Sequence, residues 1–145
     1  MRNKTGGILL IFFLSVCAQI TEVGRTAWGT STRALNDERV DAITLTYECY
    51  YDACYSAVLD LTKNQLVDDQ LIEKEVTLFQ QNYIKGYIVL MGVEGNVDTT
   101  EVGVFFSHIK QNVTKIEISS LSATAKEKVA EAIETHLTKT FSKIN

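Results

Sequence analysis

Hydrophobic and polar residues alternate along several short segments of the chain, and this period of two predicts β-strands. The expected strands span residues 43–47, 75–79, 84–91, 102–106 and 113–119. Several of them are rich in β-branched or aromatic residues, which favour extended backbone. Turn-forming residues at 81–82, 92–98 and 110–112 separate the last four strands, so we expect these strands to pair in sequence as an antiparallel meander.

Two other segments carry apolar residues at the three- and four-residue spacing of an amphipathic helix. The first helix is expected to begin with Asp52 as its N-cap and to end near Asn64. The second is expected to begin with a capping box, in which the side chains of Thr124 and Glu127 bind backbone N–H groups at the helix start. The apolar stripe of this second helix consists of Val129, Ile133, Leu137, Phe141 and Ile144. We interpret this stripe as a core surface rather than a cofactor site.

The elements follow in the order β-α-β-β-β-β-α, which defines an α+β domain over residues 42–145. Because one face of a sheet can bury the apolar stripes of both helices, we expect a two-layer sandwich: an antiparallel meander sheet with two helices on one face. The other face is expected to be solvated or to meet a partner. Residues 66–75 are acidic and are expected to form a loop.

The first 16 residues have the three-part layout of a secretory signal peptide. Arg2 and Lys4 precede an apolar run at residues 8–14, and small residues follow it. The run is shorter than the ~20 apolar residues that a membrane-spanning helix needs. We therefore expect export with removal of residues 1–16, in preference to a retained membrane anchor or a buried core helix.

The end of the signal peptide fits two kinds of processing. Residues 14–17 resemble a bacterial lipobox, in which the final residue, Cys17, receives the lipid, although Val16 departs from the small residue usual at that position. Val16 and Ala18 also suit an ordinary signal-peptidase site, which would release a soluble chain beginning at Gln19. We expect lipidation of Cys17, with cleavage after Ala18 as the alternative.

Residues 17–41 are expected to form the lipid attachment site and a polar tether. A flexible stretch of this length has an end-to-end distance on the order of 28 Å. Residues 32–40 are compatible with a helical turn or two within it. Trp28 is the one aromatic residue of the tether, and it is a candidate interaction residue that either packs on the domain, lies at the membrane interface or contacts a partner.

The three cysteines support export. If Cys17 carries a lipid, Cys49 and Cys54 remain as a pair in an oxidising compartment, where a disulfide is expected at the corner between the first strand and the first helix. The alternative is a pair of small, buried apolar side chains. A disulfide that closes so short a loop would contribute little chain entropy and would act by local pinning.

Composition and motifs argue against several function classes. The chain has 145 residues, which fits one domain, and its net charge of −4 and pI near 5.2 argue against the clustered basic face that binds nucleic acid. Two cysteines without a nearby histidine are too few for a zinc site, and His108 and His136 belong to no recognisable motif. We expect no catalytic residues, no metal and no cofactor, and we do not expect an enzyme.

Four segments carry a resemblance to a known family: the lipobox-like residues 14–17, the helix at 53–61, the hairpin entry at 96–103, and residues 116–126. With them, the chain resembles a family of small bacterial envelope lipoproteins of unknown function. The resemblance implies a lipid-anchored domain that faces the periplasm and has no transferable catalytic residues. Ala18, directly after the cysteine, resembles an outer-membrane sorting signal; a soluble periplasmic or secreted protein is the alternative. The element order is similar to that of helix-grip domains in outer-membrane assembly lipoproteins, an analogy of fold only.

Two functional hypotheses follow. The first is a structural or protein-interaction module that is held to the membrane by its N-terminal lipid and docks an envelope protein through a sheet face or strand edge. The second is a small-ligand binding module with a pocket between sheet and helices. The residues that would line such a pocket are Tyr47, Tyr50, Tyr51, Tyr55, Tyr83 and Tyr87.

We expect Cys17 to become the lipidated N-terminus, because it lies directly after the apolar run. Intact mass spectrometry of the protein from the membrane fraction should show a diacylglyceryl adduct on Cys17 and the loss of residues 1–16. A soluble mature chain that begins at Gln19 would contradict this prediction.

Overall fold

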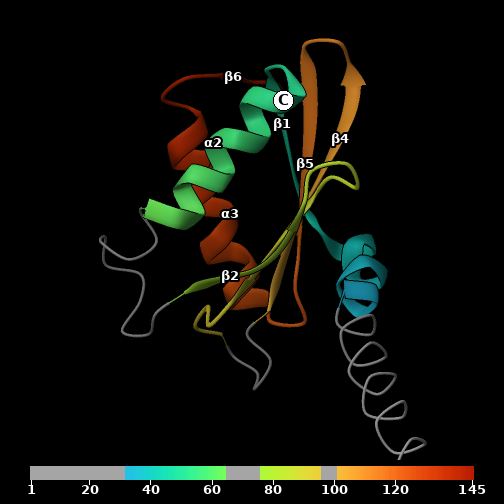
Figure 1. Cartoon of the computed structure of the whole chain (residues 1–145), viewed down its shortest axis with the longest axis vertical. Coiled ribbons are helices and arrows are strands. Elements are labelled where there is room, and N and C mark those ends of the chain that lie inside the picture. The colour runs from blue at the N-terminus through green and yellow to red at the C-terminus, as the bar shows by residue number, and fades with distance from the viewer. Residues whose placement is uncertain (1–31, 65–75, 96–100) are drawn as a thin grey trace, which may run out of the picture. The chain divides into compact units, whose positions relative to one another are not determined.

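Figure 1 shows the computed structural model of the chain, which describes residues 32–64, 76–95 and 101–145. Its larger compact unit runs from Leu35 to Asn145, so the domain begins ahead of the expected boundary at residue 42. Residues 32–37 are helical and continue into a 3-10 helix, η1 (Glu38–Asp41). The signal peptide, Cys17, Trp28 and the expected loop at 66–75 lie outside the described residues.

Within the described residues, one antiparallel sheet contains six strands in the order β2-β3-β4-β5-β1-β6. Their bounds are β1 (Ile43–Glu48), β2 (Thr77–Asn82), β3 (Tyr87–Met91), β4 (Val102–Lys110), β5 (Val113–Ser119) and β6 (Ser142–Lys143). The expected meander of four consecutive strands is confirmed, and β1 pairs with its last strand, β5.

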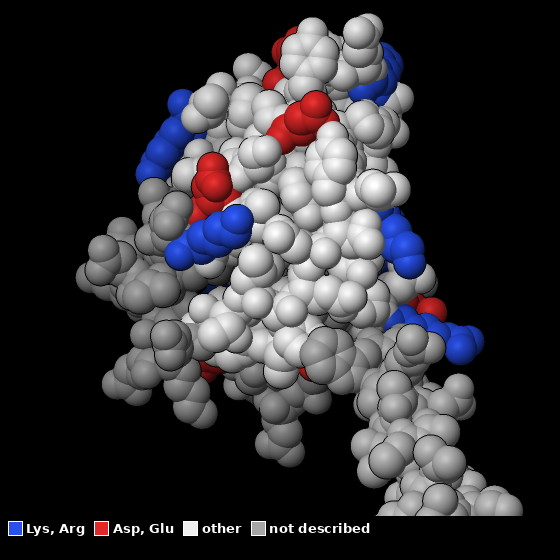
Figure 2. Space-filling model, in the orientation of Figure 1, with Lys and Arg blue, Asp and Glu red and all other residues white. Residues whose placement is uncertain are grey.

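Helices α2 (Tyr51–Asn64) and α3 (Ala123–Leu137) lie on one face of the sheet (Figure 1), which confirms the two-layer α+β sandwich. Side chains from both helices and from the sheet form one apolar core between the layers. Its largest fully buried members include Tyr47, Ile88, Leu90, Ile116, Ile118, Ile133 and Leu137. Figure 2 shows the same side of the molecule as Figure 1, and the centre of that surface has a broad area without charged side chains.

Both helices begin at residues other than those expected. Helix α2 starts at Tyr51, so Asp52 lies in its first turn and is not the N-cap. Helix α3 is capped by Ser122, whose hydroxyl accepts a hydrogen bond from the N–H of Ala125 at 3.2 Å. Thr124 therefore lies inside the first turn, and the expected capping box is wrong. Serine and threonine are both good caps, and the helix uses Ser122, whose side chain is buried.

The apolar stripe of the second helix is shorter than expected. Val129, Ile133 and Leu137 are buried, but α3 ends at Leu137. The chain then turns, and β6 pairs with the end of β1. Phe141 packs only partly against the core, and Ile144 is 41 % exposed. The last residues thus extend the sheet instead of the helix.

The first hairpin of the meander turns later than expected. Strand β2 continues to Asn82, and the turn occupies residues 83–86 instead of 81–82. The Asn82 side chain accepts a hydrogen bond from the N–H of Lys85 at 2.8 Å, and Gly86 has a φ of 68° that favours glycine. Ile84 consequently lies in the turn, 93 % exposed, and not in the strand where its apolar character placed it.

The second face of the sheet is partly covered, which corrects the expectation that it is solvated or reserved for a partner. Leu35 packs there with Tyr87, Val89 and Phe105 in a separate apolar cluster. The hydroxyl of Ser119 donates a 2.6 Å hydrogen bond to the carbonyl of Leu35. Leu35, which the sequence analysis assigned to the tether, is therefore part of the fold.

Charged residues strengthen this attachment of the segment before β1. The guanidinium of Arg39 lies 4.8 Å from the centre of the Phe105 ring and pairs with the carboxylate of Glu117, which also pairs with Lys115 at 3.2 Å. Burial acts to raise the pKa of Glu117, but hydrogen bonds from Arg39 and Lys115 outweigh it and hold that pKa below its ordinary value. The stability that this carboxylate contributes is present at neutral pH and is lost as the pH falls through its folded pKa.

Substitution Leu137→Asp should unfold the domain, because Leu137 is only 1 % exposed and a buried, unpaired carboxylate costs several kcal/mol. That cost is comparable with the whole free energy of unfolding of a small domain. Thermal unfolding followed by circular dichroism measures the effect. The matched control is Leu121→Asp, since Leu121 is 50 % exposed. A cooperative transition near the wild-type temperature in Leu137→Asp would contradict the assignment of this residue to the core.

Candidate interaction site

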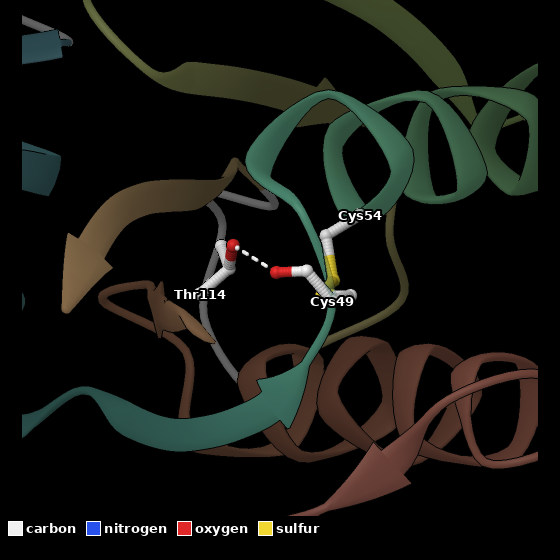
Figure 3. The surroundings of a disulfide bond; sticks show 3 residues. All are labelled: Cys49, Cys54 and Thr114. Carbon is white, nitrogen blue, oxygen red and sulfur yellow. Dashed lines mark hydrogen bonds between the residues drawn. A yellow bond between two sulfur atoms is a disulfide. The ribbon is translucent and has the colours of Figure 1, made fainter. Parts of the chain in front are cut away.

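A disulfide between Cys49 and Cys54 joins the end of β1 to the first turn of α2, as predicted. The two Cα atoms are 6.0 Å apart, and both side chains are buried. The Thr114 hydroxyl donates a 3.0 Å hydrogen bond to the carbonyl of Cys49 (Figure 3), which ties the same corner to β5. The start of α2 is therefore held at a defined place over the sheet.

Five aromatic rings gather beside this corner, and we call them the aromatic cluster: Tyr51, Tyr55, Tyr83, Phe106 and His108. Tyr51 stacks on His108 of β4 with ring centres 4.4 Å apart. Tyr83, from the β2–β3 turn, meets Tyr51 and Tyr55 edge-on at 5.3 and 5.2 Å. The ring centres of Phe106 and Tyr55 are 5.0 Å apart. Edge-on and offset pairs of this kind stabilise beyond their buried area, so the cluster is a packed unit.

The tyrosine hydroxyls of the cluster are bound within the protein. Tyr51 donates to the carbonyl of Tyr83 at 2.8 Å, Tyr55 donates to the carbonyl of Tyr87 at 3.3 Å, and Tyr83 donates to the carboxylate of Asp52. Burial is the main cause that raises the pKa of Tyr51 and Tyr55, and the hydrogen bond to Asp52 raises the pKa of Tyr83. These hydroxyls therefore stay protonated at neutral pH and serve as structural donors.

An open depression of about 330 Å³ borders the cluster. Tyr51, Tyr83 and Phe106 contribute to its wall, and Lys85 and Ser107 line it further. Small-molecule pockets of comparable volume usually enclose most of the ligand surface. A depression that opens broadly to solvent is better suited to one or two side chains of a larger partner.

Two exposed apolar side chains line this depression, Tyr83 at 48 % and Ile84 at 93 % exposure. Tyr50 and Ile109, which are 61 % and 51 % exposed, are close to the cluster in sequence but do not line the depression. Each is a member of the cluster or the chain neighbour of one. Together with the depression they form what we call the aromatic end of the domain. Soluble domains seldom gather exposed apolar residues in this way without a partner, so the aromatic end is the candidate interaction site.

The segment that leads into the domain lies at the other end of the sheet. Strand β1 begins with Ile43 opposite Ile118 and ends with Glu48 opposite Val113. The carbonyl of Leu35 binds Ser119, the last residue of β5, whereas the aromatic end lies where β1 ends and β5 begins. The aromatic end thus points away from the entry of the chain.

The six tyrosines that could have lined one pocket are separated. Tyr51, Tyr55 and Tyr83 meet in the cluster, and Tyr50 is exposed beside it. Tyr87 lies on the second face of the sheet, where its hydroxyl accepts a hydrogen bond from Gln80. Tyr47 is fully buried in the main core, its hydroxyl has no partner among the described residues, and burial raises its pKa to about 12.

His108 is exposed, in line with the surface or boundary position that the sequence favours for it, but sequence reasoning missed its stacking on Tyr51. The signal was available, because the period of two puts His108 on the same strand face as Phe106 and therefore toward the helices. His136 is half-buried on α3, as expected for a boundary residue.

Two further classes of site, a metal centre and a membrane-spanning helix, concern residues 32–64, 76–95 and 101–145. No group of three or more histidine, cysteine, aspartate or glutamate side chains is placed there to hold a metal ion. No helix in this part of the chain is long and apolar enough to cross a membrane. The chain matches no protein-family model, and no curated protein matches its sequence.

Replacing both cysteines, Cys49→Ala with Cys54→Ala, should loosen the first turn of α2 and the Tyr51–His108 stack. The sequence separation of five makes the closed loop small, so the lost chain-entropy term is only about 2 kcal/mol. Amide hydrogen exchange should quicken at residues 50–55, while the amides of α3 provide the internal reference. Unchanged exchange at the corner, or full thiol labelling of both cysteines in the exported wild-type protein, would contradict the pinning role.

Proposed function

We propose that this chain is an exported envelope protein, anchored in the outer membrane by a lipid on Cys17, that acts as a structural or protein-interaction module facing the periplasm. The observation that carries the proposal is that two exposed apolar side chains, Tyr83 and Ile84, line an open depression. Interfaces use such aromatic and aliphatic residues as anchors surrounded by polar rims.

A protein partner suits this surface better than a small ligand. The hydroxyls of Tyr51 and Tyr83 are already bound within the domain, and the depression is open. Rigid rings that need no further ordering are favourable contact residues, because their conformational entropy is already lost in the free protein. The acidic net charge gives no support to a nucleic-acid partner.

The course of the chain supports the same arrangement. The domain is entered through Leu35 at one end of the sheet, and the candidate surface lies at the other end. The segment that would connect the domain to an N-terminal lipid therefore enters it at the end opposite the aromatic end. The Cys49–Cys54 disulfide suits an oxidising compartment such as the periplasm.

Substitution Ile84→Asp should weaken partner binding by at least about tenfold, because it places a charge in an apolar contact surface. Crosslinking in the native envelope, followed by mass spectrometry of the adducts, measures the loss. Val40→Asp is the matched control, since Val40 is also aliphatic and is 92 % exposed, but lies in η1. Both variants should unfold at the wild-type temperature. Adducts that survive Ile84→Asp, or that disappear equally in Val40→Asp, would contradict docking at the aromatic end.

A further inference from the structure

Strand β4 is paired along only part of one edge. Its β3 side is covered from Val102, opposite Leu90, to Phe105, opposite Tyr87. The last main-chain bond on this side is donated by the Phe106 N–H to the carbonyl of Gly86 at 2.7 Å. Beyond it, the β4–β5 hairpin runs on (Figure 1), and within the described residues no strand pairs with residues 107–110 from the β3 side.

The open part of the edge presents main-chain hydrogen-bonding groups. In an antiparallel ladder, alternate residues direct their N–H and C=O groups to the same side. Since the N–H of Phe106 points toward the β3 side, the N–H and C=O of His108 point there too. The register irregularity between His108 and Lys110 follows directly, so His108 is the main point at which an added strand can pair.

The β2–β3 turn leaves this position accessible. Gly86, with its positive φ, bends the chain away just before β3 begins at Tyr87. The depression of the aromatic end lies between this turn and the edge of β4, because Gly86 and Lys85 line it from one side and Ser107 and His108 from the other. A main-chain edge and an apolar side-chain pocket are therefore adjacent.

An occupant of the open edge meets the β2–β3 turn at this place. A strand that lies in line with β3 runs into the turn at Gly86, where β3 itself takes over the pairing with β4. An added strand antiparallel to β4 would meet the turn with its C-terminus. Lys85 lines the depression at that point and belongs to no ion pair of the described residues, whereas the nearby Asp52 carboxylate already accepts the Tyr83 hydroxyl. A free carboxylate complements this cation.

We propose that the open edge of β4 binds the C-terminal residues of an extended polypeptide, which adds a short strand in line with β3. Main-chain bonds to His108 hold the strand, an apolar side chain enters the depression beside Tyr83 and Phe106, and the terminal carboxylate lies next to Lys85. This inference rests on the proposed interaction function and specifies the chemical class of its partner.

The probe is a library of hexapeptides with free C-termini, screened against the full chain, and the best binder is then remade with an amidated C-terminus. Amidation should weaken binding at least tenfold, and so should Lys85→Gln with the free-acid peptide. The two losses should not add, because both remove the same charge pair. Lys63→Gln, an exposed lysine at the end of α2, is the matched control and should leave the affinity unchanged.

Two further measurements test the side-chain depression and the main-chain edge of β4 separately. Tyr83→Ala should lower the affinity at least tenfold, while Leu121→Ala, at an exposed apolar residue outside the aromatic end, should not. Exchange of the His108 amide should slow at least tenfold when the peptide is bound. Equal affinity for the acid and the amide, or an unprotected His108 amide, overturns strand addition by a C-terminus. An absence of binders in the library overturns it as well.

The two proposals fail in different experiments. If native crosslinking depends on Ile84 but not on Lys85, the proposed interaction function is supported and the proposed binding of a C-terminal strand is contradicted. If crosslinking is unchanged by Ile84→Asp, the proposed interaction function is itself contradicted.

Discussion

The corner between β1 and α2 is the constraint on which the candidate site depends. The Cys49–Cys54 bond closes it covalently, and the Thr114 hydroxyl joins it to the neighbouring strand β5. The first turn of α2 is thereby held over β4, where Tyr51 can lie flat on His108. A helix free to shift along the sheet by one turn, ~5 Å, would separate these rings. The position of the aromatic cluster is thus decided by a bond outside the cluster.

The sheet is packed on both faces, and the two faces use different means. Between sheet and helices, large aliphatic side chains form a continuous core. On the second face, a smaller apolar group around Leu35 is closed by the Arg39–Glu117 pair. A domain of this size gains from such a second cluster, because a single core in a small chain leaves little margin of stability. The residues before β1 are accordingly part of the folded unit.

The sequence predicts the layers well, because period-two and helical patterns report directly on burial. Strand β5 was predicted with its exact bounds, and the disulfide followed from cysteine parity and spacing. The exact positions of turns and helix starts were not predictable in the same way, because they depend on single hydrogen bonds between nearby residues. The turn at 83–86 depends on one Asn82 hydrogen bond and on the φ of Gly86, and Ile84 mimics a strand residue. The aromatic cluster joins residues from three separate elements, and no pattern within one segment reports such contacts.

The strand order has a consequence for how the domain folds. Strand β1 comes first in the chain, yet its neighbours in the sheet are β5 and β6, which come last. The hairpins of the meander close over short loops, whereas β1 finds its partners only after most of the chain has emerged. Contacts between residues so distant in sequence slow folding, because the entropy of closing a long loop is lost before the contact forms. A chain arranged in this way cannot complete its sheet while its C-terminal part is still inside a ribosome or a translocation channel.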